Sequence, residues 1–171
     1  THLVTGGNQA AIGGVYKLAA KKENGVFIPT LKISSSYEKT TNPGIKQVYR
    51  FFDKNGQALA DLITLDSEKV NLGENHIFYH PFSTQDMFVM RRNAYQDAVP
   101  LLKKQMENGK RIAPSPTLKE IQESSREKLS HFDKSYKRQV NPHIYKVSLS
   151  TELKNLKGNL ILQAKMAEDK I

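Results

Sequence analysis

The chain has 171 residues, of which 38% are hydrophobic, and this composition is that of a globular protein with a buried core rather than a disordered one. It has no cysteine, which excludes disulfides, thiolate metal sites and cysteine nucleophiles, and its apolar runs are too short to span a membrane. Lys and Arg number 26 against 17 Asp and Glu, and the net charge of +9 favours anionic partners such as phosphorylated metabolites, nucleic acid or anionic lipid.

The first 18 residues, THLVTGGNQAAIGGVYKL, contain two glycine pairs, Gly6-Gly7 and Gly13-Gly14. Glycine permits sharp bends and close approach of the backbone to a ligand. One interpretation is a strand, a turn and a second strand that pack closely. The other is a phosphate-binding turn in which backbone N–H groups and the Thr1 hydroxyl meet an anion.

Three Asn-Gly pairs lie between apolar runs, and this dipeptide is typical of tight hairpin turns. The first predicts strands over 14–21 and 26–34. The second, Asn55-Gly56, predicts a two-residue turn between two strands, with Val48, Arg50 and Phe52 on one face and Tyr49 and Phe51 on the other. The third predicts a hairpin within VPLLKKQMENGKRI, and HIFYHPF before it reads as a short strand.

The last third of the chain has helical periodicity. An apolar stripe predicts a helix that runs through Tyr136 and ends at Asn141-Pro142, with a capping box formed by Thr117 and Glu120. The short extended link VSL precedes a second amphipathic helix capped by Ser150. Strands followed by helices indicate an α+β fold. We expect a hairpin-rich region over 1–112 and a helical segment over 113–171 packed on it.

The segment KISSSYEKTTNPGIKQVYR places lysines among hydroxyl groups and a Pro-Gly turn. Such a loop suits phosphate or pyrophosphate, because lysine supplies a mobile charge and threonine a hydrogen bond. The alternative is a solvated basic loop. His76 and His80 are four residues apart but flank a strand, with no third ligand near them in sequence. We therefore assign no metal ligand and no catalytic residue.

Several stretches resemble one family, nicotinate phosphoribosyltransferase. The start of the chain resembles the family's G-x-G-T-x-L-V-T-G and G-G-V-Y-K-L strands. LKISSSYEKTTNPGIKQVYRFFD resembles its K-T-T-N-P-G-x-K-x-V-Y-R block, and DLITL, PTLKEIQ and KRQVNPHIYKVSLSTELKNLK resemble later segments in the same order. The match covers nearly the whole chain.

This resemblance implies the C-terminal portion of a type II phosphoribosyltransferase: the end of an irregular α/β barrel, several hairpins and two closing amphipathic helices. The implied reaction joins nicotinate to 5-phosphoribosyl 1-diphosphate, giving nicotinate mononucleotide and pyrophosphate with ATP hydrolysis. It further implies Mg²⁺, a homodimer and a cytoplasmic location. Because the family's phosphorylated histidine and nicotinate-binding residues lie upstream of the matching segments, this chain alone is expected to be inactive and to need no cofactor by itself.

Four residues match phosphate-contacting positions of the family. Thr1 matches the threonine of the G-x-G-T phosphate loop, and Lys17, Lys32 and Lys39 match basic positions close to the phosphates. The competing hypothesis is a non-catalytic module that binds RNA or another polyanion, with Tyr37, Tyr49 and Phe51 stacking on bases. No RNA-recognition signature supports it.

Overall fold

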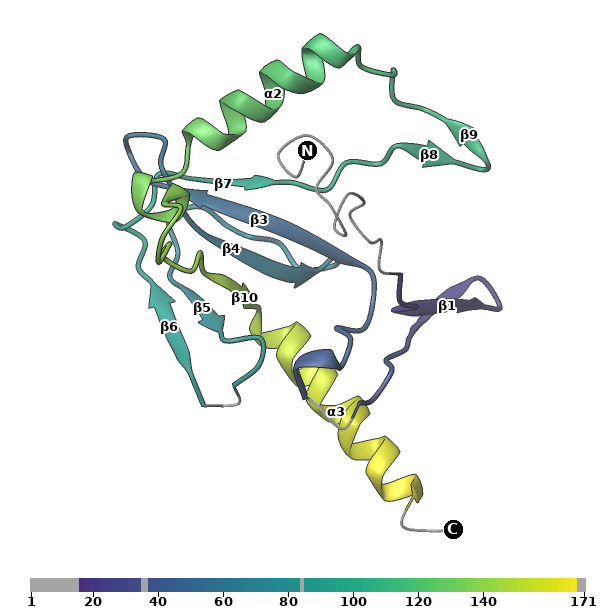
Figure 1. Cartoon of the computed structure of the whole chain (residues 1–171). Helices are drawn as coiled ribbons and strands as arrows, with labels where there is room; N and C mark the ends of the chain where they lie inside the picture. The colour runs from purple at the N-terminus through teal and green to yellow at the C-terminus, as the bar shows by residue number, and fades with distance from the viewer. Residues whose placement is uncertain (1–15, 35–36, 84, 169–171) are drawn as a thin grey trace.

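The computed structural model describes residues 16–34, 37–83 and 85–168, and its centre is a six-stranded sheet (Figure 1). The strand order is β6-β5-β10-β4-β3-β7. The strands are β3 (Lys46–Phe52), β4 (Ala58–Leu65), β5 (His76–Tyr79), β6 (Met87–Met90), β7 (Asp97–Pro100) and β10 (Val147–Leu149). With two helices beside this sheet, the α+β prediction is confirmed.

The sheet is mixed because its neighbouring strands come from distant parts of the sequence. β10 lies parallel to β4 and antiparallel to β5, while β3 and β4 form a long antiparallel pair. The predicted extended link VSL is therefore a strand inside the sheet. Residues 147–149 thus tie the C-terminal part of the chain to the hairpin region. The division at residue 112 stays a prediction.

One face of the sheet carries the hydrophobic core. Phe51 and Phe78 are fully buried and pack edge to face, with ring centroids 5.1 Å apart. Leu62, Met90 and Tyr95 complete the centre of this cluster. Because side chains alternate along β3, Phe51 and Tyr49 face the core while Arg50 lies on the opposite face, paired with Asp61 of β4. The predicted alternation of β3 is confirmed.

Two of the three Asn-Gly pairs form the expected two-residue turns. Asn24 and Gly25, with φ of 48° and 84°, join β1 (Ala20–Glu23) to β2 (Val26–Pro29). Asn108 and Gly109, with φ of 48° and 74°, join β8 (Met106–Glu107) to β9 (Lys110–Arg111). Both residues of each pair have the positive φ that such turns require. Of the predicted strands over 14–21 and 26–34, residues 14 and 15 lie outside the described residues; among the described ones, the hairpin begins only at Ala20 and ends at Pro29.

The two-residue turn predicted at Asn55-Gly56 is wrong. The Asp53 N–H donates to the Gln57 carbonyl at 2.9 Å, and Gly56 N–H donates to the Asp53 carbonyl at 3.0 Å, so three residues form the turn. Only Gly56 of the pair has positive φ, at 74°. The cause is the Asp53 carboxylate, whose Oδ1 accepts from the N–H groups of Asn55 and Gln57, both at 2.8 Å.

The first predicted helix is shorter than its apolar stripe suggested. α2 spans Leu118–Ser130, and the capping box of Thr117 and Glu120 is present. The helix ends there because His131 contacts the β3–β4 turn, with its Nδ1 2.8 Å from the Gly56 carbonyl. Asp133 then caps a 3₁₀ helix, η3 (Lys134–Lys137). The prediction of a continuous helix to Asn141 is therefore wrong.

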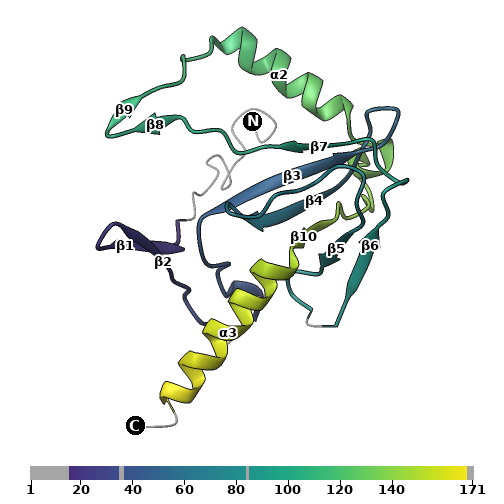
Figure 2. The ribbon, with the colours of Figure 1, turned by 180° about the vertical axis from the view of Figure 1, so that it is seen from behind.

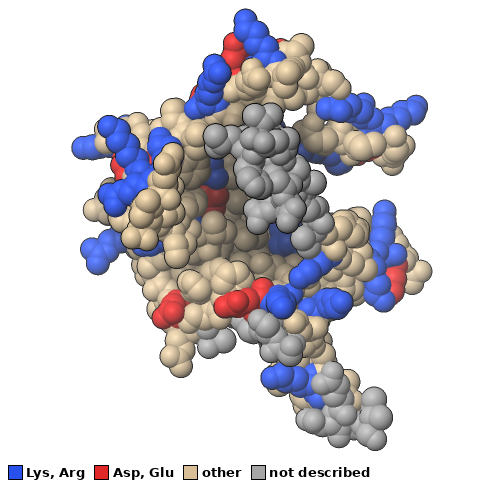
Figure 3. Space-filling view, in the orientation of Figure 1, with Lys and Arg blue, Asp and Glu red and all other residues tan. Residues whose placement is uncertain are grey.

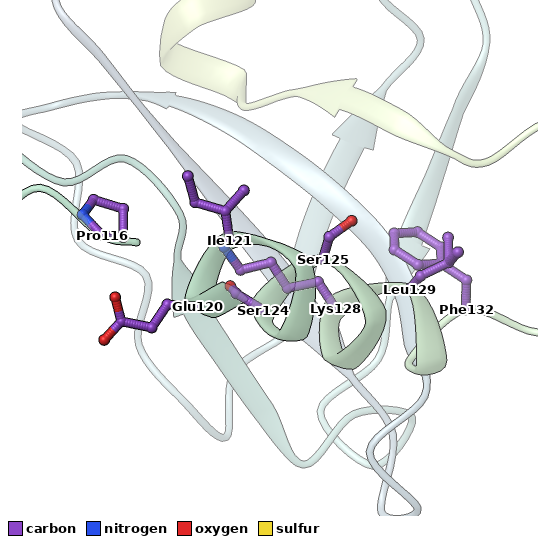
Figure 4. Close-up of a pocket in the computed structure, with 8 residues that line it drawn as sticks. All are labelled: Pro116, Glu120, Ile121, Ser124, Ser125, Lys128, Leu129 and Phe132. Carbon is purple, nitrogen blue, oxygen red and sulfur yellow. The ribbon is translucent and has the colours of Figure 1, made fainter. Parts of the chain in front are cut away.

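The stripe of α2 is not part of the core, since none of the residues of α2 is buried. The side chains of Leu118, Ile121 and Leu129 are 71%, 50% and 55% exposed. Figure 4 shows the side chains from Pro116 to Phe132 that line an open groove of about 500 Å³ along this helix. α2 stands apart from the sheet in both ribbon views (Figures 1 and 2).

The second helix, α3 (Thr151–Glu168), begins as predicted at Ser150, whose Oγ accepts from the Leu153 N–H at 3.2 Å. Leu153 is fully buried, and the helix packs on β4 and β5. Its C-terminal half extends beyond the sheet (Figure 2). In the part of the chain that the structure describes, neither α2 nor α3 has the length and apolarity needed to cross a membrane.

Candidate functional site

The sequence TTNPG forms a tightly packed loop over residues 40–44, called here the 40–44 loop, directly before β3. Thr40 is only 6% exposed, and Pro43 is also buried. Gly44 has φ of +84°, and a Cβ at this position would lie 2.9 Å from Leu65 Cδ2 and 3.6 Å from Leu156 Cδ2. Glycine is therefore required both by the backbone conformation and by the close approach of β4 and α3.

Backbone hydrogen bonds connect this loop to two other elements. Gly44 N–H donates to the Ala19 carbonyl at 2.7 Å, and that carbonyl also accepts from Thr30 N–H at 2.9 Å. On the other side, Asp66 N–H donates to the Ile45 carbonyl at 3.0 Å. The base of the β1–β2 hairpin and the end of β4 therefore hold the loop from both sides.

The three described lysines among the candidate residues meet at this loop. Lys17 Nζ donates to the Lys39 carbonyl at 3.0 Å, and Lys32 N–H donates to Thr41 Oγ1 at 2.9 Å. Lys39 belongs to a short 3₁₀ helix, η2 (Tyr37–Lys39), that enters the loop. All three lysines are exposed. Thr1 lies outside the described residues.

A fourth lysine, which was not among the residues predicted from the sequence, contacts the loop from α3. Lys157 of α3 is 1% exposed, and its Nζ donates to Asn42 Oδ1 at 3.0 Å. Burial lowers the pKa of this lysine below its ordinary value. The available signal was its position one helical turn after Leu153, within the apolar stripe of α3, where a lysine is unusual.

A fifth lysine completes the surroundings of the loop. Lys46, the first residue of β3, donates from Nζ to the Gly44 carbonyl, and partial burial lowers its pKa. Its ammonium is therefore directed back to the loop from which β3 begins. Figure 3 shows that Lys and Arg predominate over Asp and Glu on the visible face, near the β1–β2 end, the β8–β9 hairpin and α2.

A carboxylate joins α3 to the sheet beside this loop. Glu68 Oε1 accepts from the Leu65 N–H and from Ser150 Oγ, both at 2.6 Å. Since Ser150 also caps α3, Glu68 connects the end of β4 to the first turn of the helix that carries Lys157. The position of Lys157 against Asn42 is therefore set by the contacts of α3 with the loop and with the end of β4.

A cavity of about 540 Å³ lies next to the loop, between the β5–β6 hairpin and β10. Asn42 lines it together with Phe78, Phe88 and Lys146, whose Nζ lies 4.6 Å from the centre of the Phe88 ring. Asn42 thus both accepts from Lys157 and lines this cavity.

The two histidines considered for metal binding have separate partners. His76 Nε2 lies 3.0 Å from the Asn71 carbonyl, and the ring packs on Phe51. His80 lines the cavity, and its Nδ1 accepts from the N–H groups of Phe82 and Ser83 at 3.2 and 3.0 Å. Among the described residues, no group of three or more His, Asp or Glu side chains is arranged to hold a metal ion.

On the face of the sheet opposite to the Phe51 core, Arg50 and Asp61 form a paired cluster. The guanidinium donates to Asp61 from Nε and Nη2, both at 2.8 Å, and Tyr145 donates to the same carboxylate at 2.9 Å. Phe132 covers the guanidinium, with 4.7 Å from Cζ to the ring centre. Burial first, and then the Asp61 charge, raises the pKa of Tyr145. The cluster anchors residues 132–145 to the sheet.

The sequence of this chain is similar to the sequences of known proteins. The sequence pattern of the family described as "Nicotinate phosphoribosyltransferase C-terminal domain" matches residues 45–157. Nicotinate phosphoribosyltransferase of Caenorhabditis elegans is 37% identical over 95% of this chain, and that of Bacillus subtilis is 36% identical over 89%. The chain spans only 28% and 31% of the length of these two relatives.

The fold agrees with the sequence comparison. The crystal structure of human nicotinic acid phosphoribosyltransferase superposes with a TM-score of 0.62 at 27% identity, covering 71% of this chain and 24% of the human one. The family match covers more than half of the chain and includes β3, β4, β10 and the first part of α3. The chain therefore belongs to the nicotinate phosphoribosyltransferase family, to the part of it described as the C-terminal domain.

Proposed function

We propose that this chain is the C-terminal part of a nicotinate phosphoribosyltransferase and that Lys17, Lys32 and Lys39 contribute phosphate-binding groups to its active site. The observation that carries the proposal is that contacts of these three lysines converge at the 40–44 loop: Lys17 Nζ donates to the Lys39 backbone carbonyl, and the Lys32 backbone N–H donates to Thr41 Oγ1. The lysines come from three separate segments, and all three lie outside the loop itself, with Lys39 directly before it.

The chemistry of the proposed reaction requires such groups. When nicotinate displaces pyrophosphate from 5-phosphoribosyl 1-diphosphate, positive charge develops on the ribose and negative charge on the departing pyrophosphate. Cations held in fixed positions stabilise the leaving group and hold the sugar in place. A loop already held by Pro43, Gly44 and their neighbours loses little conformational entropy when an anion binds.

The remaining parts of the proposal come from the family. They are nicotinate, 5-phosphoribosyl 1-diphosphate and ATP as substrates, Mg²⁺, a homodimer, a cytoplasmic location, and a barrel built with the segments that this chain does not contain. Thr1 is proposed to join the phosphate-binding groups. Among the described residues we assign no Mg²⁺ ligand. The chain alone is proposed to be inactive.

The test is the substitution Lys39→Ala in the full-length enzyme that carries this chain. We expect the KM for 5-phosphoribosyl 1-diphosphate or for ATP to rise roughly ten- to hundredfold, as is typical when a charge-assisted contact is removed. The matched control is Lys54→Ala, because Lys54 is an exposed lysine in the turn at the far end of β3.

Two results would contradict the proposal. One is a KM for both phosphate substrates within about twofold of the parent, as expected for a solvated surface charge. The other is binding of single-stranded RNA by the chain that weakens steeply with salt and is not displaced by 5-phosphoribosyl 1-diphosphate. That second result would favour the polyanion-binding hypothesis.

A further inference from the structure

We infer that Lys157 of α3 is a positioning residue for phosphate binding: through Asn42 it fixes the loop that contains Thr41 and directly follows Lys39. This inference rests on the proposed function. The contact that carries it is the 3.0 Å hydrogen bond from Lys157 Nζ to Asn42 Oδ1. Because the Lys157 residue is only 1% exposed, it acts on the anion through Asn42 and not by direct contact.

The donor chemistry of lysine fixes the orientation of the asparagine. An ammonium group has three donors and no acceptor, so only the oxygen of the Asn42 amide can face it. The amide nitrogen, with two donors, is consequently directed away from α3. Asn42 lies between Thr41, which accepts from Lys32 N–H, and Pro43, which is buried. A rotation of Asn42 would therefore disturb the segment that holds the lysines together.

A lysine at this position has a cost that packing alone does not justify. Lys157 follows Leu153, the fully buried anchor of α3, by one helical turn, and its neighbour Leu156 lies beside Gly44. Burial of an ammonium is unfavourable, and an apolar side chain of similar volume is often equally or more stabilising at such a site. A methionine would fill the space without that cost. What methionine lacks is the donor to Asn42.

Contacts at the N-terminus of α3 keep this donor in place. Glu68 connects the end of β4 to Ser150, and Ser150 caps the helix. Leu65, whose N–H donates to Glu68, also lies 2.9 Å from the position of a Cβ on Gly44. The loop, the end of β4 and the first two turns of α3 therefore form one continuous packed unit around Asn42.

The experiment compares Lys157→Met, Asn42→Ala and the double variant in the full-length enzyme, with Lys39→Ala measured beside them. We expect each single variant to raise the KM for 5-phosphoribosyl 1-diphosphate roughly two- to thirtyfold while kcat stays within about twofold. The double variant should be no worse than the stronger single variant, because both remove the same contact. Leu153→Met is the matched control on the same helix face: it alters packing without touching Asn42.

The outcomes distinguish the positioning role of Lys157 from the phosphate-binding role of Lys39. If Lys39→Ala raises the KM but Lys157→Met does not, the positioning role is overturned and the phosphate site stands. If the effects of Lys157→Met and Asn42→Ala multiply, the hydrogen bond is not the route and the inference fails. If Lys39→Ala has no effect, the proposed function fails and the inference with it. Should Lys157→Met not fold, Asn42→Ala decides by its KM alone, and an unchanged value overturns the inference.

Discussion

The two helices of this chain differ in a way that their sequences do not reveal. Both have an N-terminal cap and an apolar stripe, and the capping box of α2 is the more complete. Yet Leu153 of α3 is fully buried, whereas Leu129 of α2 is 55% exposed. A cap and a stripe thus establish that a helix forms and which side is apolar, but the surface that covers this side must come from elsewhere in the fold.

The difference has a simple geometric cause. α3 follows β10 directly and is linked through Ser150 and Glu68 to the end of β4, so its apolar side turns onto the sheet. α2 is attached to the sheet at its C-terminal end, where His131 meets the β3–β4 turn. Most of its length extends past β7 towards the β8–β9 hairpin (Figure 1). Contacts around α3 should therefore dominate stability, and those along α2 should matter little.

The largest expected loss in the free energy of unfolding comes from breaking the Arg50–Asp61 ion pair. Asp61→Ala leaves Arg50, which is only 18% exposed, without its carboxylate partner, and it also removes the acceptor of Tyr145. Breaking a buried pair in this way costs about 3–5 kcal/mol. The comparison is Glu123→Ala on α2, where the partner Lys119 is 84% exposed and 3.9 Å away, so the loss should be below about 0.5 kcal/mol. Urea unfolding measures both, and similar losses would contradict the contrast.

Leucine truncation compares the two helices directly. Leu153→Ala empties a fully buried position, and the expected loss in the free energy of unfolding is about 3 kcal/mol. Leu129→Ala removes the same atoms from a side chain that is 55% exposed, and the expected loss is below about 1 kcal/mol. Thermal and urea unfolding of the two variants provide the measurement. Equal losses would show that the stripe of α2 is covered in solution.

Replacing Gly44 or Gly109 by alanine separates the effect of packing on stability from the effect of backbone strain. Gly44→Ala combines positive φ with a Cβ 2.9 Å from Leu65 Cδ2, whereas Gly109→Ala in the β8–β9 turn has the same kind of φ and no atom within 4 Å. We expect about 2 kcal/mol for Gly44→Ala and about 1 kcal/mol for Gly109→Ala, the latter from backbone conformation alone. Differential scanning calorimetry of both variants tests the order. A reversed order would mean that Leu65 moves aside freely.

Local patterns predicted much of the fold. Asn24-Gly25 and Asn108-Gly109 form the expected turns, because the twist of a two-residue hairpin needs positive φ at both residues. Where a side chain competed with the pattern, the prediction failed. Asp53 accepts two N–H groups and makes a three-residue turn of Asn55-Gly56, and His131 stops α2 by a contact 75 residues away in sequence.

The candidate site could be predicted only in part. Local chemistry and resemblance predict Lys17, Lys32 and Lys39; contacts of all three converge at one loop, and their binding of phosphate stays a prediction. The role of Lys157 is not encoded locally, because its partner Asn42 is 115 residues away in sequence. The order of the sheet, with β10 between β5 and β4, was likewise inaccessible. Such a pairing depends on how distant segments meet.

The smallest expected effect is a change in the pH dependence of stability when Lys157 is replaced by methionine. Burial disfavours the charged ammonium, so the folded chain holds this proton less tightly than the unfolded chain, and the pKa lies below 10.5. Stability should therefore rise with pH between the lowered pKa and 10.5, as the unfolded chain retains the proton that the folded chain has lost. Lys157→Met should abolish this rise.

The measurement is the difference in unfolding free energy between the parent and Lys157→Met at a series of pH values from neutral to 10.5. Working with the difference removes the contribution of Lys46, whose lowered pKa acts in the same direction, and of Tyr145, whose raised pKa acts in the opposite direction at high pH. Lys119→Met, which removes an exposed lysine of α2, controls for the loss of one charge. Since the ammonium of Lys157 is the group that the fold disfavours, the parent should gain stability relative to Lys157→Met as the pH rises. A constant difference would show that the Asn42 hydrogen bond offsets the burial of Lys157 completely, and the cost of placing lysine in the apolar stripe of α3 would then vanish.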